Sequence, residues 1–177
     1  MTDTLRRHEG RIVALTGAAS GMGRCTATRM AAEGASVFGI DIDGEGLAAV
    51  TAEVTAAGGT MHSRVTDLAE PAECRAAVEA AVVQYGRLDV VGTFAAISWM
   101  KNATEVTVEE WRRLFAINVD GTFFTCQAAL PHVLEAEGSI VTIASNAAFM
   151  GQAYLAPYCA TKGAIAQITR ALAMEFV

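Results

Sequence analysis

Short apolar runs alternate along the chain with longer segments in which apolar residues recur at helical spacing. The runs at residues 12–15 and 36–40 lack the polar alternation of a half-exposed strand, so they predict strands that are covered on both faces. Further strands are expected at residues 60–65, 88–96 and 139–144. The helical segments are expected at residues 22–33, 45–57, 71–85, 107–134 and 156–176. Strands that alternate with helices predict an α/β fold with a doubly wound parallel sheet.

The segment at residues 107–134 contains an interruption of its helical pattern. Its apolar stripe is formed by Val108, Trp111, Phe115 and Val119. Asn118 lies within this stripe, and Gly121 and Pro131 follow it. Because glycine and proline disturb regular helix geometry, the segment is either one long helix with a local irregularity or two helices in tandem.

The composition describes a globular chain that is suited to small-molecule partners. A chain of 177 residues, 53% of them hydrophobic and 18% charged, is expected to form a single domain over residues 1–177. The formal net charge of -6 and the lack of a Lys/Arg cluster argue against nucleic acid as a partner. The long uncharged stretch at residues 138–161 contains Asn146, Gln152 and Pro157, so it is too polar for a membrane helix.

Four cysteines are spread along the chain, at Cys25, Cys74, Cys126 and Cys159. They form no C-x-x-C pair and lack the histidine spacing of a zinc site, so no metal ion is expected. Reduced thiols are typical of a cytoplasmic protein, and the amino-terminal residues lack the apolar core of a signal peptide. We therefore expect a cytoplasmic protein.

The first predicted strand ends in three closely spaced glycines. Gly17 is expected to let the chain turn, Gly21 to let the backbone approach a ligand, and Gly23 to let the next helix pack close to the strand. Free N–H groups and the positive dipole end of a helix favour an anion, so the turn predicts a site for a dinucleotide diphosphate. An ordinary glycine-rich turn is the alternative, since the spacing Gly-x-x-x-Gly-x-Gly differs from the usual Gly-x-Gly-x-x-Gly.

Two acidic residues follow the second and third predicted strands. Asp41 lies about 20 residues beyond the glycines, where a carboxylate accepts hydrogen bonds from the adenine ribose of a dinucleotide. Its alternative role is in a turn or helix cap, although Asp43 already suits the cap. Asp67 either lies near the adenine or caps the helix that begins at Pro71.

Three candidate catalytic residues follow the fifth predicted strand. Ser145 comes directly after it, while Tyr158 and Lys162 are four residues apart and therefore share one face of the final helix. A tyrosine has an unperturbed pKa of about 10, and a neighbouring ammonium favours its phenolate form. Such a tyrosine exchanges a proton with an alcohol or a carbonyl as hydride leaves or arrives. Ser145 is a candidate for holding the same oxygen.

The motifs Thr16-Gly17-x-x-x-Gly21-x-Gly23, Asn118, Ser145 and Tyr158-x-x-x-Lys162 together resemble the short-chain dehydrogenase/reductase family. The resemblance implies that Tyr158 is the catalytic acid/base and that Lys162 activates it and binds the nicotinamide ribose. It also implies that Ser145 orients the substrate oxygen, and that Asn118 holds a water that links Lys162 to solvent.

The same resemblance implies a nicotinamide dinucleotide cofactor, with NAD favoured over NADP. Asp41 resembles the acid that selects NAD, because its carboxylate repels a 2′-phosphate. Family members that prefer NADP usually carry a basic residue where this chain has Ser20 or Ile42. Asp67 resembles the acid that binds adenine. The candidate cofactor-binding residues are Thr16, Gly17, Ser20, Gly21, Met22, Gly23, Asp41, Asp67, Ala95, Tyr158 and Lys162.

The chain departs from the family pattern in two places. The family usually has Asn-Asn-Ala-Gly after the fourth strand, whereas this chain has Thr93-Phe94-Ala95-Ala96, so cofactor affinity or geometry is expected to differ. The family also continues with further strands beyond the length of this chain. The resemblance therefore implies a Rossmann-like sheet of order 3-2-1-4-5 with the later strands missing. Its fifth strand would be an open apolar edge, which favours a homo-oligomer.

These residues predict an NAD-dependent oxidoreductase that interconverts a secondary alcohol and a ketone by hydride transfer, with Tyr158 as acid/base. The alternative is a catalytically impaired nucleotide-binding fragment or an interaction module. An epimerase or dehydratase is a third reading, but its expected Gly-x-x-Gly-x-x-Gly turn is not present.

Overall fold

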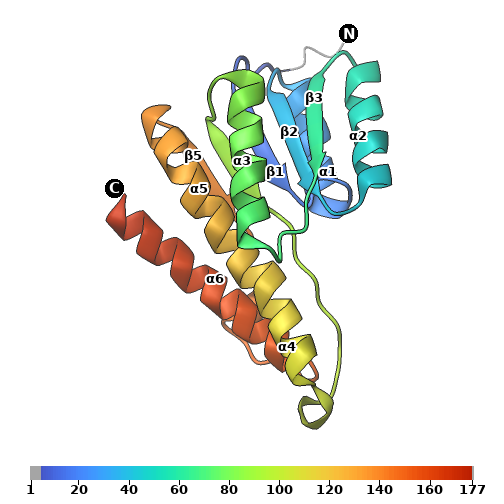
Figure 1. The fold of residues 1–177 in the computed structure, drawn as a ribbon, viewed down its shortest axis with the longest axis vertical. Helices are drawn as coiled ribbons and strands as arrows, with labels where there is room; N and C mark the ends of the chain where they lie inside the picture. Colours follow the sequence, from blue (N-terminus) through green and yellow to red (C-terminus); the bar gives the residue numbers. More distant parts are fainter. Residues whose placement is uncertain (1–4, 177) are drawn as a thin grey trace.

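The computed structural model describes residues 5–176, in which parallel strands lie between two layers of helices (Figure 1). The strands are β1 (Ile12–Thr16), β2 (Ser36–Asp41), β3 (Thr60–Val65), β4 (Val90–Thr93) and β5 (Ser139–Thr142). The helices are α1 (Gly21–Ala32), α2 (Gly44–Ala56), α3 (Pro71–Tyr85), α4 (Val108–Phe115), α5 (Gly121–Glu135) and α6 (Ala156–Glu175). Short helical turns are η1 (Ala103–Glu105), η2 (Ala116–Asp120) and η3 (Asn146–Ala148).

The sheet has the order β3-β2-β1-β4-β5 with all pairs parallel, which confirms the predicted fold and strand order. The chain crosses from β1 toward β2 in one direction and later returns to β4 on the other side of β1. The carboxyl ends of β1, β2 and β4 therefore surround a topological switch point, which is where ligands bind in open α/β sheets.

Two cores lie on the two faces of the sheet. Helices α1 and α2 cover one face, where the buried core includes Val13, Leu15, Val37, Leu47 and Val50. Helices α3 and α5 cover the other face, and α6 lies beside α5 on the same side (Figure 1). A hydrogen bond of 2.6 Å between the hydroxyls of Thr142 and Thr169 ties α6 to β5. Both faces are covered near the switch point, as the unbroken apolar runs predict.

The predicted strand at residues 88–96 is too long. β4 ends at Thr93, where its neighbours β1 and β5 also end, at Thr16 and Thr142. Beyond that point side chains replace strand partners: the backbone N–H of Ala95 donates to the hydroxyl of Thr16 at 3.2 Å. The apolar run continues, but the sheet does not, because no neighbouring strand extends far enough to pair with it.

The segment predicted at residues 107–134 forms one long helix with a local irregularity, the first of the two alternatives. The α-helical turns of α4 pass into the π-helical turn η2, which contains Asn118, and continue as α5. The interruption therefore falls at Asn118, and Pro131 lies within α5. α4 begins with a capping box, in which Thr107 and Glu110 bond each other's backbone N–H groups.

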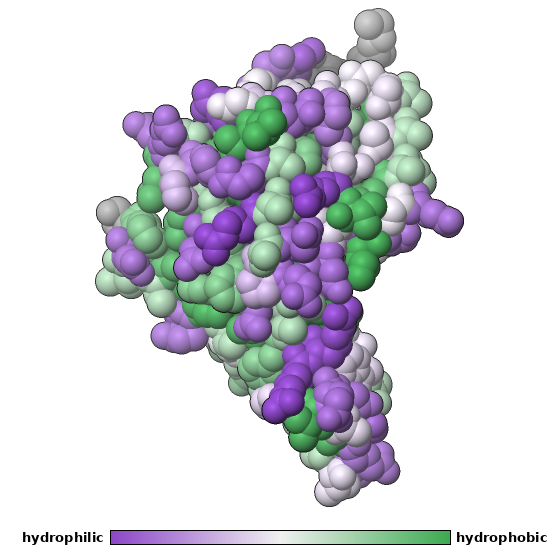
Figure 2. Space-filling view, in the orientation of Figure 1, coloured by the Kyte–Doolittle hydropathy of each residue, from purple (hydrophilic) through white to green (hydrophobic). Residues whose placement is uncertain are grey.

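The surface mixes polar and apolar side chains. On the face shown in Figure 2, hydrophilic and hydrophobic residues are interspersed over most of the molecule. Within residues 5–176, none of the helices combines the length and the apolar character needed to cross a membrane.

A buried carboxylate, Asp89, joins the amino-terminal ends of β1 and β4. Its side chain is 1% exposed and accepts hydrogen bonds from the backbone N–H of Ile12 at 2.9 Å and from the guanidinium groups of Arg11 and Arg87 at 3.0 and 2.7 Å. Burial raises the pKa of Asp89, but these hydrogen bonds outweigh burial and hold the pKa below its usual value. The ionised carboxylate is therefore the stable form in the folded protein.

We expect Asp89→Asn to lower the free energy of unfolding by about 2 kcal/mol, since a buried charge-assisted network loses its charge. Urea unfolding at pH 7 measures this change. Because the pKa of Asp89 is lower in the folded state, its stabilisation is present above about pH 4 and is lost as the pH falls through the folded pKa. The variant should lack this part of the acid dependence, whereas Glu109→Gln at an exposed position should retain it.

Candidate active site

The glycine turn between β1 and α1 is built as predicted. Gly17 has φ +68°, and a Cβ atom on it would lie 2.8 Å from the backbone nitrogen of Ala95. A Cβ on Gly23 would collide with the carbonyl group of Gly17. Gly21 has φ +51° and no atom near the position of a Cβ, so its surroundings are open. Gly17 and Gly23 therefore allow close backbone packing, while Gly21 borders free space.

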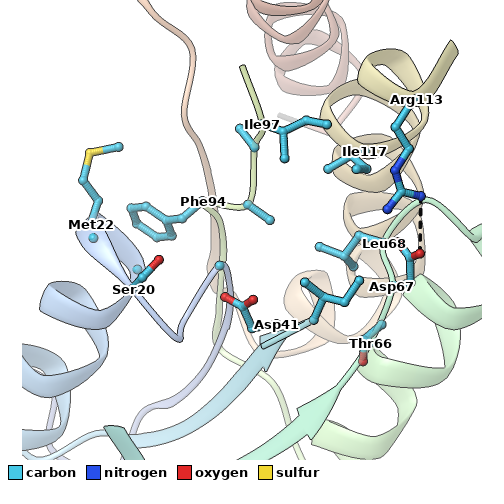
Figure 3. A pocket seen from close by; sticks show the side chains of 16 residues that line it. Ser20, Met22, Asp41, Thr66, Asp67, Leu68, Phe94, Ile97, Arg113 and Ile117 are labelled. Carbon is cyan, nitrogen blue, oxygen red and sulfur yellow. Dashed lines mark hydrogen bonds and ion pairs between the residues drawn. The ribbon is translucent and has the colours of Figure 1, made fainter. Parts of the chain in front are cut away.

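A cavity of about 330 Å³ lies at this turn, over the carboxyl ends of the central strands (Figure 3). Eight of the residues predicted to bind cofactor line it: Gly17, Ser20, Gly21, Met22, Gly23, Asp41, Asp67 and Ala95. Thr16 lies just beneath and holds the Ala95 backbone. The remaining lining residues are Ile42, Thr66, Leu68, Phe94, Ala96, Ile97, Arg113 and Ile117.

Asp41, at the end of β2, presents a fixed carboxylate to this cavity. One oxygen accepts a hydrogen bond from the backbone N–H of Ala19 at 3.0 Å, and the other accepts one from the N–H of Asp43 at 3.1 Å. The cap of α2 is Asp43, which accepts a hydrogen bond from the Gly46 N–H. Asp41 is therefore free of the capping role and is held in place by the glycine turn.

Asp67 lies on the other side of the cavity and takes part in an ion pair. One carboxylate oxygen accepts a hydrogen bond from the backbone N–H of Ala69 at 3.0 Å, and the other lies 3.4 Å from a guanidinium nitrogen of Arg113 on α4 (Figure 3). The carboxylate thus stabilises the turn before α3 and also faces the cavity. Arg113 was not among the predicted site residues, because 46 residues separate it from Asp67.

Asn118 joins three segments at a point without solvent access. Its amide donates to the carbonyl of Ile97 at 2.9 Å and to the hydroxyl of Thr161 at 3.2 Å, and its oxygen accepts from the N–H of Ile97 at 2.8 Å. The side chain thus binds the Ile97 backbone as a neighbouring strand would. The Thr161 hydroxyl in turn donates to the carbonyl of Tyr158 at 2.8 Å. Asn118 therefore connects the segment after β4 with the first turns of α6.

Tyr158 and Lys162 lie together in the first turns of α6. The Lys162 ammonium is 5.7 Å from the centre of the Tyr158 ring and donates a hydrogen bond of 2.7 Å to the carbonyl of Ile143. Lys162 is buried, and burial lowers the pKa of its ammonium. Two residues beyond Ile143, the hydroxyl of Ser145 accepts a hydrogen bond from the N–H of Ala147. Tyr158 and Lys162 therefore come from α6, and Ser145 comes from the segment that follows β5. The hydrogen bond from Lys162 to Ile143 joins these two segments directly.

The architecture defines a Rossmann-like fold with its glycine turn at the switch point of the sheet. A family model described as short chain dehydrogenase matches residues 11–177. The chain belongs to this family.

Several curated proteins are similar to nearly the whole chain. The chain is 34% identical over 171 residues to D-threitol dehydrogenase of Mycolicibacterium smegmatis, covering 96% of this chain and 66% of that protein. It is 33% identical over 169 residues to meso-2,3-butanediol dehydrogenase of Serratia marcescens, with the same coverage. The chain thus spans about two thirds of the length of these relatives.

Solved structures share the fold. The crystal structure of carveol dehydrogenase from Mycobacterium avium in complex with NAD aligns with a TM-score of 0.89 and 28% identity, over 94% of this chain and 66% of that one. A short-chain type dehydrogenase/reductase from Mycobacterium marinum aligns with a TM-score of 0.91 and 27% identity, over 97% of this chain and 71% of that one.

We expect Asn118→Ala to lower the free energy of unfolding by about 2 kcal/mol, because it removes the partner of the partly buried N–H and C=O groups of Ile97. Thermal and urea unfolding measure this loss. Asn102→Ala removes an exposed asparagine that caps only η1, and should cost far less. Similar losses in the two variants would show that the Asn118 network does not hold the segments together.

Proposed function

We propose that the protein is an NAD-dependent oxidoreductase that interconverts a secondary alcohol and a ketone. The observation that carries this proposal is the placement of a buried ammonium, Lys162, over the ring of Tyr158 and against the backbone that leads to Ser145. The relatives named as D-threitol and meso-2,3-butanediol dehydrogenases support an alcohol or diol as substrate. Membership of the short chain dehydrogenase family supports the reaction class.

The proposed chemistry divides between the cofactor and the side chains of the chain. NAD, when bound, supplies the hydride acceptor, and NADH supplies the hydride in the reverse direction. Tyr158 takes the hydroxyl proton of the alcohol, or returns a proton to the carbonyl oxygen during reduction. The Lys162 ammonium, 5.7 Å from the centre of the Tyr158 ring, places a positive charge beside the group that exchanges the proton. The Ser145 hydroxyl holds the substrate oxygen by hydrogen bonding.

The residues around the cavity fit an NAD molecule. Gly21 leaves the amino-terminal end of α1 open, and no side chain caps that end. Its N–H groups are therefore available to a diphosphate. The Asp41 carboxylate suits ribose hydroxyls and opposes a 2′-phosphate, while the neighbouring Ser20 and Ile42 carry no positive charge. Arg113 is paired with Asp67 rather than with Asp41.

The proposal also includes a cytoplasmic location and a homo-oligomeric state. Cys74 and Cys126 are buried as free thiols, which suits a reducing compartment. β5 lies at an edge of the sheet within the described residues, and Val141 on this strand is 47% exposed. An apolar strand edge favours association with further chains.

We expect Tyr158→Phe to lower kcat at least about a thousandfold while changing the Kd for NADH less than about threefold, because it removes the proton-transferring hydroxyl and no part of the glycine turn. Steady-state kinetics and fluorescence titration measure the two quantities. Tyr154→Phe is the matched control, since it removes the hydroxyl of an exposed tyrosine four residues earlier in the sequence. Substantial activity in Tyr158→Phe would show that another group transfers the proton.

We expect NADH to bind at least about tenfold more tightly than NADPH, because the 2′-phosphate would approach the Asp41 carboxylate. Asp41→Asn should reduce this ratio, since the neutral amide keeps the shape and loses the charge. Asp43→Asn alters a nearby acid that caps α2 and should leave the ratio unchanged. Fluorescence titration with both cofactors provides the test, and equal affinities in the wild-type protein would contradict the assignment.

A further inference from the structure

Phe94, the residue that departs most in size from the family pattern, is packed against a glycine two positions earlier. An ideal Cβ on Gly92 would lie 2.5 Å from Cε2 of the Phe94 ring and 2.7 Å from Cδ2 of Leu15. Neither distance is possible for real carbon atoms in van der Waals contact. The ring therefore occupies the space that a side chain at position 92 would need.

The surrounding sheet explains why this space belongs to the ring. In the parallel register Leu15 of β1 is paired with Gly39 of β2 on one side and with Gly92 of β4 on the other. On this face Leu15 thus has a glycine on each neighbouring strand. Phe94 packs against the core cluster of the same face, which includes Leu15 and residues of α1. An aromatic ring at position 94 fills the gap next to Leu15 that Gly92 leaves open.

The other side of the Phe94 ring meets the cofactor cleft. In Figure 3 the ring points toward Ser20 and Met22, at the start of α1, and all three residues line the cavity. The backbone that follows Phe94 also touches the glycine turn, because a Cβ on Gly17 would lie 3.0 Å from the Phe94 carbonyl carbon. Phe94 therefore lies between Gly92 and the part of α1 that borders the open space at Gly21.

We propose that the small residue Gly92 and the large residue Phe94 form a complementary pair that keeps the amino-terminal turn of α1 in position for the cofactor diphosphate. The small residue at 92 lets the large ring lie back against the strand, so the ring leaves the amino-terminal turn of α1 undisturbed and the diphosphate site open. Any side chain at position 92 displaces the ring toward Ser20 and Met22, because the packed sheet leaves the ring no space on the opposite side. Gly92 is thus a positioning residue, and this assignment rests on the proposed binding of NAD.

The test is a double-mutant cycle with Gly92→Ala, Phe94→Asn and the combined variant, with NADH, ADP and adenosine as ligands. We expect Gly92→Ala to weaken NADH and ADP binding about tenfold and adenosine binding less than about twofold, because the displacement affects the diphosphate site. Phe94→Asn in the same chain removes the nearer of the two clashes and should restore NADH affinity to within about threefold of the wild-type value. Calorimetric or fluorescence titration provides the affinities.

The unfolding midpoint of the ligand-free protein gives an independent measurement. Gly92→Ala should lower it by about 5 °C, and Phe94→Asn should recover more than half of that loss. Gly59→Ala is the matched control, since its Cβ would crowd Val54 and Ala31 of the same core cluster but not Phe94. Phe94→Asn should not rescue this control, and the control should bind ADP as the wild type does once folded.

Three results would overturn the proposed coupling of Gly92 and Phe94. They are unchanged ADP affinity in Gly92→Ala, additive losses of NADH affinity in the combined variant, or equal losses of affinity for adenosine and ADP. If Gly92→Ala does not fold, Phe94→Trp makes the same crowding from the other partner and should weaken ADP binding similarly. Unchanged ADP binding in Phe94→Trp would count against the pair. A wild-type protein that binds neither NADH nor ADP would contradict the proposed function itself. That result is distinguishable from a failure of the Gly92–Phe94 proposal, in which the wild-type protein still binds both ligands.

Discussion

The turn after β1 is in direct backbone contact with two other parts of the chain, and the geometry of the cleft depends on this contact. Gly17 packs against the backbone of Ala95, and Gly23 packs against the carbonyl of Gly17. A single added methyl group at either position would separate α1 from β1 or β1 from the segment after β4. The cavity therefore lies where backbones approach one another most closely, and small residues there are a geometric requirement.

Side-chain hydrogen bonds extend this arrangement beyond the sheet. After β4 ends, the Thr16 hydroxyl holds the N–H of Ala95, and the Asn118 amide holds both backbone groups of Ile97. The π-helical turn places Asn118 where it also meets Thr161 of α6. The π-helical turn thus lies where one polar side chain joins its own helix to two other segments. Such turns are rare and occur frequently at functional sites.

The sequence was sufficient for the features that depend on local pattern. The alternation of short runs with helical segments predicted the five strands, glycine spacing predicted the turn, and Asp43 was recognised as a better cap than Asp41. Features that depend on distant partners were missed or wrong. The apolar run after β4 resembled more strand, because nothing in it reveals where neighbouring strands end. The ion pair of Asp67 with Arg113 joins residues far apart in sequence, and no local pattern predicts it.

Asn118 was recognised from the sequence, but its hydrogen-bond partners were not. The resemblance implied a water-holding role for Asn118, and its irregular place in the helix was visible in the sequence. Its contacts with Ile97 and Thr161 required the structure, because they depend on how the segment after β4 and α6 approach η2. A side chain whose amide nitrogen and oxygen both join segments also fixes the backbone around it. Any role of Asn118 in proton transfer would therefore fall to its main chain or to the atoms that it positions.

Lys162 is the point at which folding stability and the proposed chemistry conflict. The residue is 3% exposed, and within residues 5–176 the hydrogen-bond acceptor of its ammonium is the carbonyl of Ile143, although an ammonium has three donors. Burial lowers its pKa, which means that the charged form is destabilised there. A purely structural position would favour an apolar residue of similar size. A buried ammonium beside Tyr158, bonded to the segment after β5, is therefore consistent with the proposed chemistry, which needs a positive charge with unused donors.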